Sequence, residues 1–136
     1  MRFRIALASV LFAIACGSDS TTGPTAVSLA GTWNLQSVNG SSLPFVIAQT
    51  GANKAELVSD VVTVVPTGSF TEITTVRNTI NGQVTTSSVG DAGSYVLNGT
   101  AVTFQFNSDG SVGTGSISGN TLTVATNGFS YIYTKQ

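Results

Sequence analysis

The side chains best suited to chemistry in this 136-residue chain are carboxylates, because the sequence contains no histidine. Histidine is the usual general base and the commonest metal ligand, so a Ser-His-Asp arrangement is excluded. Two acids could still act as in a glycosidase. Glu56 and Asp60 could share one face of a strand, and Glu72 could approach them from the next strand. We favour the interpretation that these acids are solvated edge charges, and we predict no catalytic residue.

The other acids of the body sit beside turn residues. Asp91 and Asp109 each have a glycine as a neighbour, so both are interpreted as serving backbone geometry. The segment "NSDGSVGTG" (107–115) offers oxygen ligands, but it lacks the bidentate Glu that closes an EF-hand calcium loop. The sequence therefore predicts no metal site and no cofactor.

The single cysteine, Cys16, ends a three-part opening, "MRFRIALASVLFAIAC". Two arginines come first, an apolar run covers residues 5–15, and a small residue precedes the cysteine. This is the layout of a secretory signal, and the apolar run is too short to span a bilayer. A lone thiol in a secreted chain needs an explanation. The arrangement "AIAC" resembles the lipobox of bacterial lipoproteins, which implies that cleavage occurs before Cys16 and that its thiol is lipidated.

This resemblance divides the chain into a lipoprotein signal peptide (1–15), a lipidated cysteine with a flexible tether (16–28) and a folded domain (29–136). The tether sequence after the cysteine, "GSDSTTGPTAVS", is polar and lacks apolar periodicity. Two or more acyl chains hold a protein stably on a membrane. Gly17, rather than Asp, follows the cysteine, and by enteric sorting rules this favours the outer membrane over the inner. We expect a lipid-anchored protein of the bacterial cell envelope, with the membrane as its partner.

The charge pattern does not predict a surface that binds nucleic acid. Charged residues make up 8% of the chain and the formal net charge is −1. The few cations are scattered, whereas nucleic-acid binding needs a clustered basic surface. Polarity comes instead from Thr, Ser, Asn and Gly, which suits a surface built of β-strands.

From Leu29 onward, short alternating runs are separated by turn signals, and no helix is predicted. Asn-Gly, Asp-Gly and Gly-Asn pairs supply the positive φ that tight hairpins require. We predict an all-β fold, an antiparallel up-and-down meander of about eight to ten strands that closes into a small barrel and so satisfies both edges. The expected strands are 31–39, 42–50, 56–65, 69–80, 83–90, 92–97, 100–106, 111–118, 121–126 and 129–135.

The segment "GTW" (31–33) resembles the G-x-W at the first strand of lipocalins, and "GSYVLNGTAVTFQFNSDGSVGTGSISGNTLTV" resembles the repeating hairpins of small bacterial lipocalin-like lipoproteins. The resemblance implies that Gly31 permits a tight bend and that Trp33 packs across the closed end of a barrel. It also implies a non-enzymatic protein that binds a small hydrophobic ligand or lipid. The same opening resembles the META/HslJ-like envelope domain, which implies a filled barrel acting through its polar Thr/Ser-rich surface. That family's mid-domain Gly-Cys-Asn segment is missing here, so we rank it second.

Strand alternation gives the barrel an inward-facing apolar set. These side chains either line a ligand site or fill the core. Because small barrels are commonly filled by side chains, we favour the core interpretation. The residues to which both interpretations apply are Trp33, Leu35, Tyr95, Phe104, Phe106 and Tyr131.

Overall fold

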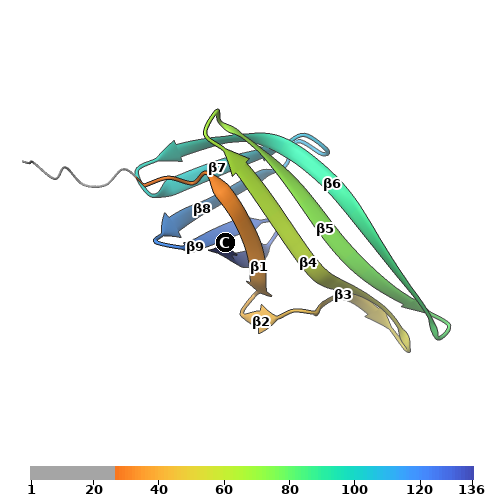
Figure 1. Cartoon of the computed structure of the whole chain (residues 1–136). Coiled ribbons are helices and arrows are strands. Elements are labelled where there is room, and N and C mark those ends of the chain that lie inside the picture. Colours follow the sequence, from red (N-terminus) through yellow and green to blue (C-terminus); the bar gives the residue numbers. More distant parts are fainter. Residues whose placement is uncertain (1–26) are drawn as a thin grey trace, which may run out of the picture.

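The computed structural model describes residues 27–136, so the predicted signal peptide, the predicted lipidation site Cys16 and most of the predicted tether lie outside the described residues. The described chain forms one antiparallel sheet (Figure 1). Its strands are β1 (Gly31–Val38), β2 (Ser41–Ser42), β3 (Phe45–Thr50), β4 (Asn53–Val65), β5 (Ser69–Ile80), β6 (Gln83–Asn98), β7 (Ala101–Phe106), β8 (Val112–Ser118), β9 (Thr121–Thr126) and β10 (Phe129–Lys135).

Strand β1 closes this sheet into a barrel. On one side it pairs with β10, with Leu35 opposite Tyr133, and on the other it pairs with β4, with Trp33 opposite Val62. The remaining strands follow one another in sequence order from β4 to β10. The predicted meander therefore closes into an eight-stranded barrel, while β2 and β3 lie outside the ring, paired with β1 and β4. The predicted fold class is confirmed.

Three of the predicted hairpin turns carry an Asn-Gly pair in the left-handed region. Asn39, Asn81 and Asn127 have φ angles of 49°, 51° and 51°, and the glycine after each also has a positive φ. Positive φ at both central residues is typical of a type I′ turn, whose twist matches that of the flanking strands. These turns thus explain why β2, β6 and β10 fold back on the strands that precede them.

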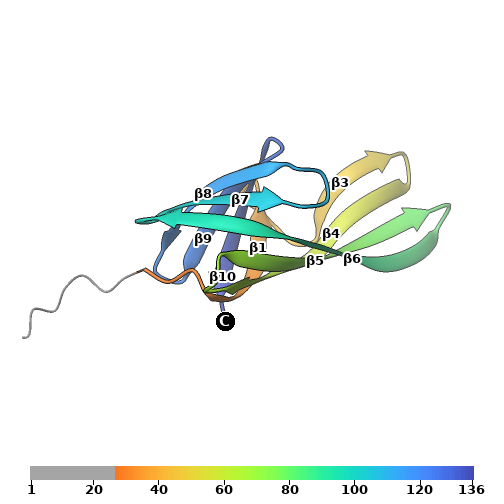
Figure 2. The ribbon, with the colours of Figure 1, turned by 90° about the horizontal axis from the view of Figure 1, so that it is seen from above.

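Strand β6 is continuous where the sequence predicted two strands, 83–90 and 92–97. Gly90 and Asp91 stay in register opposite Ile73 and Glu72 on β5, so they do not form a turn. The long strands β4, β5 and β6 consequently extend past the barrel on one side, and β3 lies along β4 there (Figures 1 and 2). We call this extension the overhang, and it comprises residues 45–57, 75–80 and 83–90.

The end of the barrel that holds Trp33, here called the closed end, is filled by side chains. Trp33 is fully buried, and its indole N–H donates a 2.8 Å hydrogen bond to the carbonyl of Leu29, itself buried. The ammonium of Lys135 lies 5.3 Å from the indole centroid. The buried apolar core consists of Leu29, Trp33, Leu35, Val38, Leu57, Val62, Val64, Phe70, Val102, Phe104, Ile117, Leu122, Val124 and Tyr133.

Candidate functional site

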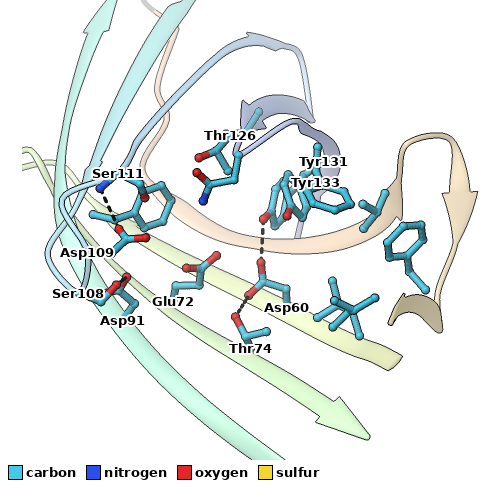
Figure 3. Close-up of a pocket in the computed structure, with 18 residues that line it drawn as sticks. Asp60, Glu72, Thr74, Asp91, Ser108, Asp109, Ser111, Thr126, Tyr131 and Tyr133 are labelled. Atoms are coloured by element: carbon cyan, nitrogen blue, oxygen red, sulfur yellow. Dashed lines mark hydrogen bonds between the residues drawn. The ribbon is translucent and has the colours of Figure 1, made fainter. Parts of the chain in front are cut away.

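The opposite end of the barrel, here called the mouth, contains a cavity of about 290 Å³ (Figure 3). Its walls come from β1, β3 to β7, β9 and β10, together with the 107–111 loop. Exposed residues of that loop and of the β9–β10 turn form the rim, so the cavity opens to solvent. Its principal apolar lining residues are Val38, Phe45, Leu57, Phe106, Phe129 and Tyr131.

Aromatic rings form a continuous wall along the mouth. Phe45 meets Phe129 edge to face at 6.1 Å, and Phe129 lies 6.2 Å from Tyr131. Tyr131 stacks on Tyr133 at 6.5 Å between centroids. Such pairs contribute beyond their buried area and hold the rings in defined orientations. The wall therefore presents a rigid apolar surface to the cavity.

The six residues predicted as ligand lining or core divide between these two regions. Phe106 and Tyr131 line the cavity, whereas Trp33, Leu35 and Phe104 belong to the buried core. The sixth, the half-buried Tyr95, packs against that core. The filled-core interpretation thus describes the closed end, and the mouth is hollow.

Asp60 is the most deeply buried acid of the cavity wall, with 4% of its surface exposed. One carboxylate oxygen accepts a 2.7 Å hydrogen bond from the hydroxyl of Tyr133, and the other accepts a 3.1 Å bond from that of Thr74 (Figure 3). Buried acids are tolerated when their oxygens are satisfied in this way. The solvated-edge interpretation is wrong for Asp60, because it has protein donors in place of water, and it is also wrong for Glu56, of whose surface only 5% is exposed.

Glu72 lies on β5, diagonal to Asp60 across the β4–β5 pair, and the two acids line the same cavity. Burial, the Asp60 charge and, to a lesser degree, the Asp91 charge raise the pKa of Glu72 to about 8. Near neutral pH, Glu72 therefore keeps its proton and can donate it in a hydrogen bond. Burial also raises the pKa of Tyr131 and of Tyr133, so both phenols stay protonated.

Two further acids stand at the rim of the cavity. Asp91 accepts hydrogen bonds from the Ser108 hydroxyl (2.6 Å) and from the Ala92 N–H (2.7 Å). Asp91 lies within β6 rather than in a turn, and its contact with the backbone is the bond from the Ala92 N–H. Asp109 is a turn residue as predicted, and bonds from Ser111 lower its pKa. The described lining carries four acids and no Lys or Arg.

A bulge in β4 explains why Glu56 is not part of this site. The register against β5 shifts between Leu57 and Ser59, so one extra residue interrupts the alternation of side chains. Glu56 therefore lies on the outer face, where Lys54 and Arg77 bind it at 2.8 and 3.0 Å. The expectation that Glu56 and Asp60 share a face is wrong.

Sequence reasoning missed the site formed by Asp60, Glu72 and Thr74, although one signal for it existed. Asp60 alternates with Val62 and Val64, both buried, which places it on the inward face. Glu72 likewise follows Phe70 by two residues, and Phe70 is buried. An acid among the inward-facing residues of each of two adjacent strands is therefore the sequence signal that predicts this site.

Within residues 27–136, no three side chains of the His, Cys, Asp and Glu types are grouped so as to hold a metal ion. The same part of the chain contains no helix that is long and apolar enough to cross a membrane.

No protein-family model matches the sequence, and no curated protein matches it. Among solved structures, the chain is similar to an uncharacterized protein from Bacteroides eggerthii, with 13% identity and a TM-score of 0.45 over 80% of this chain and 100% of that one. It is also similar to fatty-acid-binding protein 1 of Echinococcus granulosus, with 14% identity and a TM-score of 0.33 over 79% of this chain and 96% of that one.

Proposed function

We propose that this protein is a non-enzymatic binding module whose barrel holds a small amphipathic molecule, on a lipid anchor in the bacterial cell envelope. The observation that carries the proposal is the cavity at the mouth of the barrel. Its volume of about 290 Å³ lies at the lower end of the ~300–1,000 Å³ typical of ligand sites. The ligand is accordingly small, with an apolar body that lies against the ring wall of Phe45, Phe129 and Tyr131.

The polar lining supports a ligand end that is positively charged or neutral. Asp60, Asp91 and Asp109 place negative charge around the cavity, and the described lining has no cation to offset it. A ligand carboxylate would meet like charge in a partly desolvated site, which is unfavourable. An amine or a hydroxyl would instead find acceptors, and an amine would add attraction to the carboxylates.

The arrangement of the acids supports a binding role over catalysis. Both oxygens of Asp60 already accept hydrogen bonds, from Tyr133 and Thr74. Glu72, on the neighbouring strand, keeps its proton near neutral pH, so it offers a hydrogen-bond donor beside the Asp60 carboxylate. This pair is therefore built to hold a proton and a ligand group.

Calorimetric titration with octylamine, octanol and octanoate tests the ligand class, because these probes share a chain and differ in the end group. We expect octylamine to bind at least about tenfold more tightly than octanoate, equivalent to about 1.4 kcal/mol, with octanol between them. Thr126→Trp places a ring in the cavity wall and should abolish binding. Thr103→Trp, at an exposed position of β7, is the matched control and should leave binding unchanged. No heat with any probe, or binding that Thr126→Trp leaves intact, contradicts the proposal.

The anchor is tested separately in living cells. Cys16→Ser should abolish metabolic labelling with palmitate and release the protein from the membrane fraction. The anchor would place the protein in the outer membrane rather than the inner, which fractionation of the envelope checks. Unchanged palmitate labelling of the Cys16→Ser variant would refute the anchor and would leave the ligand proposal standing.

A further inference from the structure

Strand β6 has an open edge over its first half. On one side, β5 pairs with β6 from Gln83 to Ser94, whereas on the other side β7 pairs with it only from Gly93 onward. Within the described chain, residues 83–91 therefore have a strand along one edge only, and Figure 1 shows this part of β6 at the border of the overhang. We call residues 83–91 the open edge. Its outward backbone groups are a ready template for another strand.

The backbone groups that face outward can be assigned from the point where the open edge ends. The carbonyl of Ala92 accepts a 2.9 Å hydrogen bond from the N–H of Asn107, on the β7 side of the strand. Because backbone groups in an antiparallel ladder alternate between the two sides, every second residue before Ala92 also faces outward. These residues are Val84, Thr86, Ser88 and Gly90.

The open edge lacks the sequence and structural features that usually prevent an edge strand from pairing with another strand. It contains no Lys, Arg or Pro, and its one charge, Asp91, lines the cavity. Its register with β5 is free of bulges. The other edge of the overhang, β3, is shorter and has a register shift between Val46 and Ala48. Bulges and short length protect an edge, so β3 is protected and β6 is not.

Apolar side chains add to the case for a partner strand. Val84 is 61% exposed and Val89 is 64% exposed, and they lie on opposite faces of the open edge. A neighbouring strand would cover part of both side chains and would supply hydrogen-bond partners for the backbone. The surface that needs covering is thus narrow, uncharged and strand-shaped.

We propose that the open edge pairs antiparallel with the open edge of a second copy of this chain. A pairing centred on Ser87 places Thr86 opposite Ser88 of the partner subunit and Val84 opposite the partner's Gly90. All four outward-facing residues then find partners, and Ser87 is small enough for the close approach at the centre. Opposite residues point to the same face, so the two overhangs join into one continuous sheet.

The symmetry of this contact limits the assembly to a dimer. The same segment is used by both copies, so the contact is isologous and closes at two subunits. Pairing of β6 with β3 would instead be heterologous and would build open chains, which the bulge in β3 opposes. A contact of this size lies below ~1,200 Å², and we expect half-dissociation at about 10–100 μM protein.

The test uses the chain from Gly17, which retains every pairing of the barrel and lacks the only cysteine. Sedimentation velocity from about 1 to 1,000 μM should show a monomer–dimer equilibrium. Ser88→Lys places a charge on the open edge and should weaken the dimer at least about tenfold, while Ser88→Pro removes an outward N–H and should do the same.

Thr75→Lys is the matched control. Thr75 lies opposite Ser88 on β5, and the two hydroxyls share a 3.0 Å hydrogen bond. Each lysine variant therefore loses the same bond and adds the same charge, but only Ser88 lies on the edge. Hydrogen exchange should also show slower exchange at Thr86 and Ser88 in concentrated samples. A monomer at every concentration, or a dimer that both lysine variants weaken equally, overturns the proposal, which does not depend on ligand binding.

Discussion

Tyr133 on β10 donates a 2.7 Å hydrogen bond to Asp60 on β4, and the two strands are held on either side of β1. The bond therefore crosses the interior at the place where the barrel closes. It joins the last strand to the fourth across 73 positions of sequence. One side chain thus links the two strands that flank β1 and satisfies a buried carboxylate.

Tyr133→Phe removes this donor and keeps the ring. Because Asp60 remains buried with one fewer partner, we expect a loss of about 1–3 kcal/mol in the free energy of unfolding. Denaturant titration measures it. Tyr95→Phe is the control, since the Tyr95 hydroxyl donates to the Val65 carbonyl at an exposed site. Equal losses of unfolding free energy in the two variants would show that the bond to Asp60 stabilises the protein no more than an exposed hydrogen bond does.

Glu72 makes stability depend on pH. Its pKa rises from the ordinary 4.5 to about 8 on folding, so the folded state holds a proton that the unfolded chain releases between those values. The contribution of Glu72 to stability should be complete below about pH 4.5 and should be lost as pH rises towards 8, by at most about 1.4 kcal/mol per pH unit. Glu72→Gln should flatten this slope.

Asp109→Asn is the control for the pH measurement. Bonds from Ser111 lower the pKa of Asp109 below its ordinary 3.8, so its contribution is present above that value and is lost only in more acidic solution. Denaturant titrations at pH 5 to 8 should therefore show the same slope in Asp109→Asn as in the wild type. A slope that survives Glu72→Gln would assign the effect to another group.

Trp33 should dominate the stability of the closed end. Trp33→Ala opens a void in the filled core and should cost about 3–5 kcal/mol. Trp33→Phe restores most of the volume but leaves the buried carbonyl of Leu29 without its donor, so we expect about 1–3 kcal/mol. Thermal and denaturant unfolding measure both. A loss below about 0.5 kcal/mol for Trp33→Phe would mean that water replaces the indole N–H.

Gly115 is required for close packing of β8 against β9. A Cβ at this position would collide with the backbone oxygen of Thr123. We therefore expect Gly115→Ala to destabilise the barrel by about 1–3 kcal/mol, because backbone has to move. At Gly90, a Cβ would make ordinary contact, 3.7 Å from the Glu72 carbonyl. Gly90→Ala should fold with near-normal stability, and circular dichroism during heating compares the two.

The strand order could be predicted from sequence because its signals are local. Asn39, Asn81 and Asn127 each specify a hairpin through residues that tolerate positive φ, and consecutive hairpins leave little choice of topology. Closure through Trp33 and its neighbours followed from the same pattern, since a long meander otherwise leaves two edges. The continuous course of β6 through Gly90 was missed, because glycine marks a turn in sequence but is extended here.

The site could be predicted less well because it depends on pairings between strands. The position of Asp60 relative to Tyr133 follows from the register across β1, which no local pattern encodes. Glu56 and Asp60 lie on different faces because of a bulge, and the residue pattern of "ELVSDVV" does not predict that bulge. The rings Phe106 and Tyr131 were identified, but whether they enclosed space could be learned only from the packed barrel.

The extra residue at the bulge in β4 places two acids of the same strand on opposite faces of the sheet. Before it, Glu56 belongs to a surface ion cluster with Lys54 and Arg77, and after it, Asp60 belongs to the interior. Deleting Val58 alone would keep Leu57 opposite Val76 and Ser59 opposite Thr75, and both acids would stay on their present faces, because Glu56 and Asp60 would then be three residues apart in a regular strand. The number of residues between the two acids, together with the bulge, therefore decides which carboxyl pairs with two cations and which lies in the interior, and composition alone does not determine it.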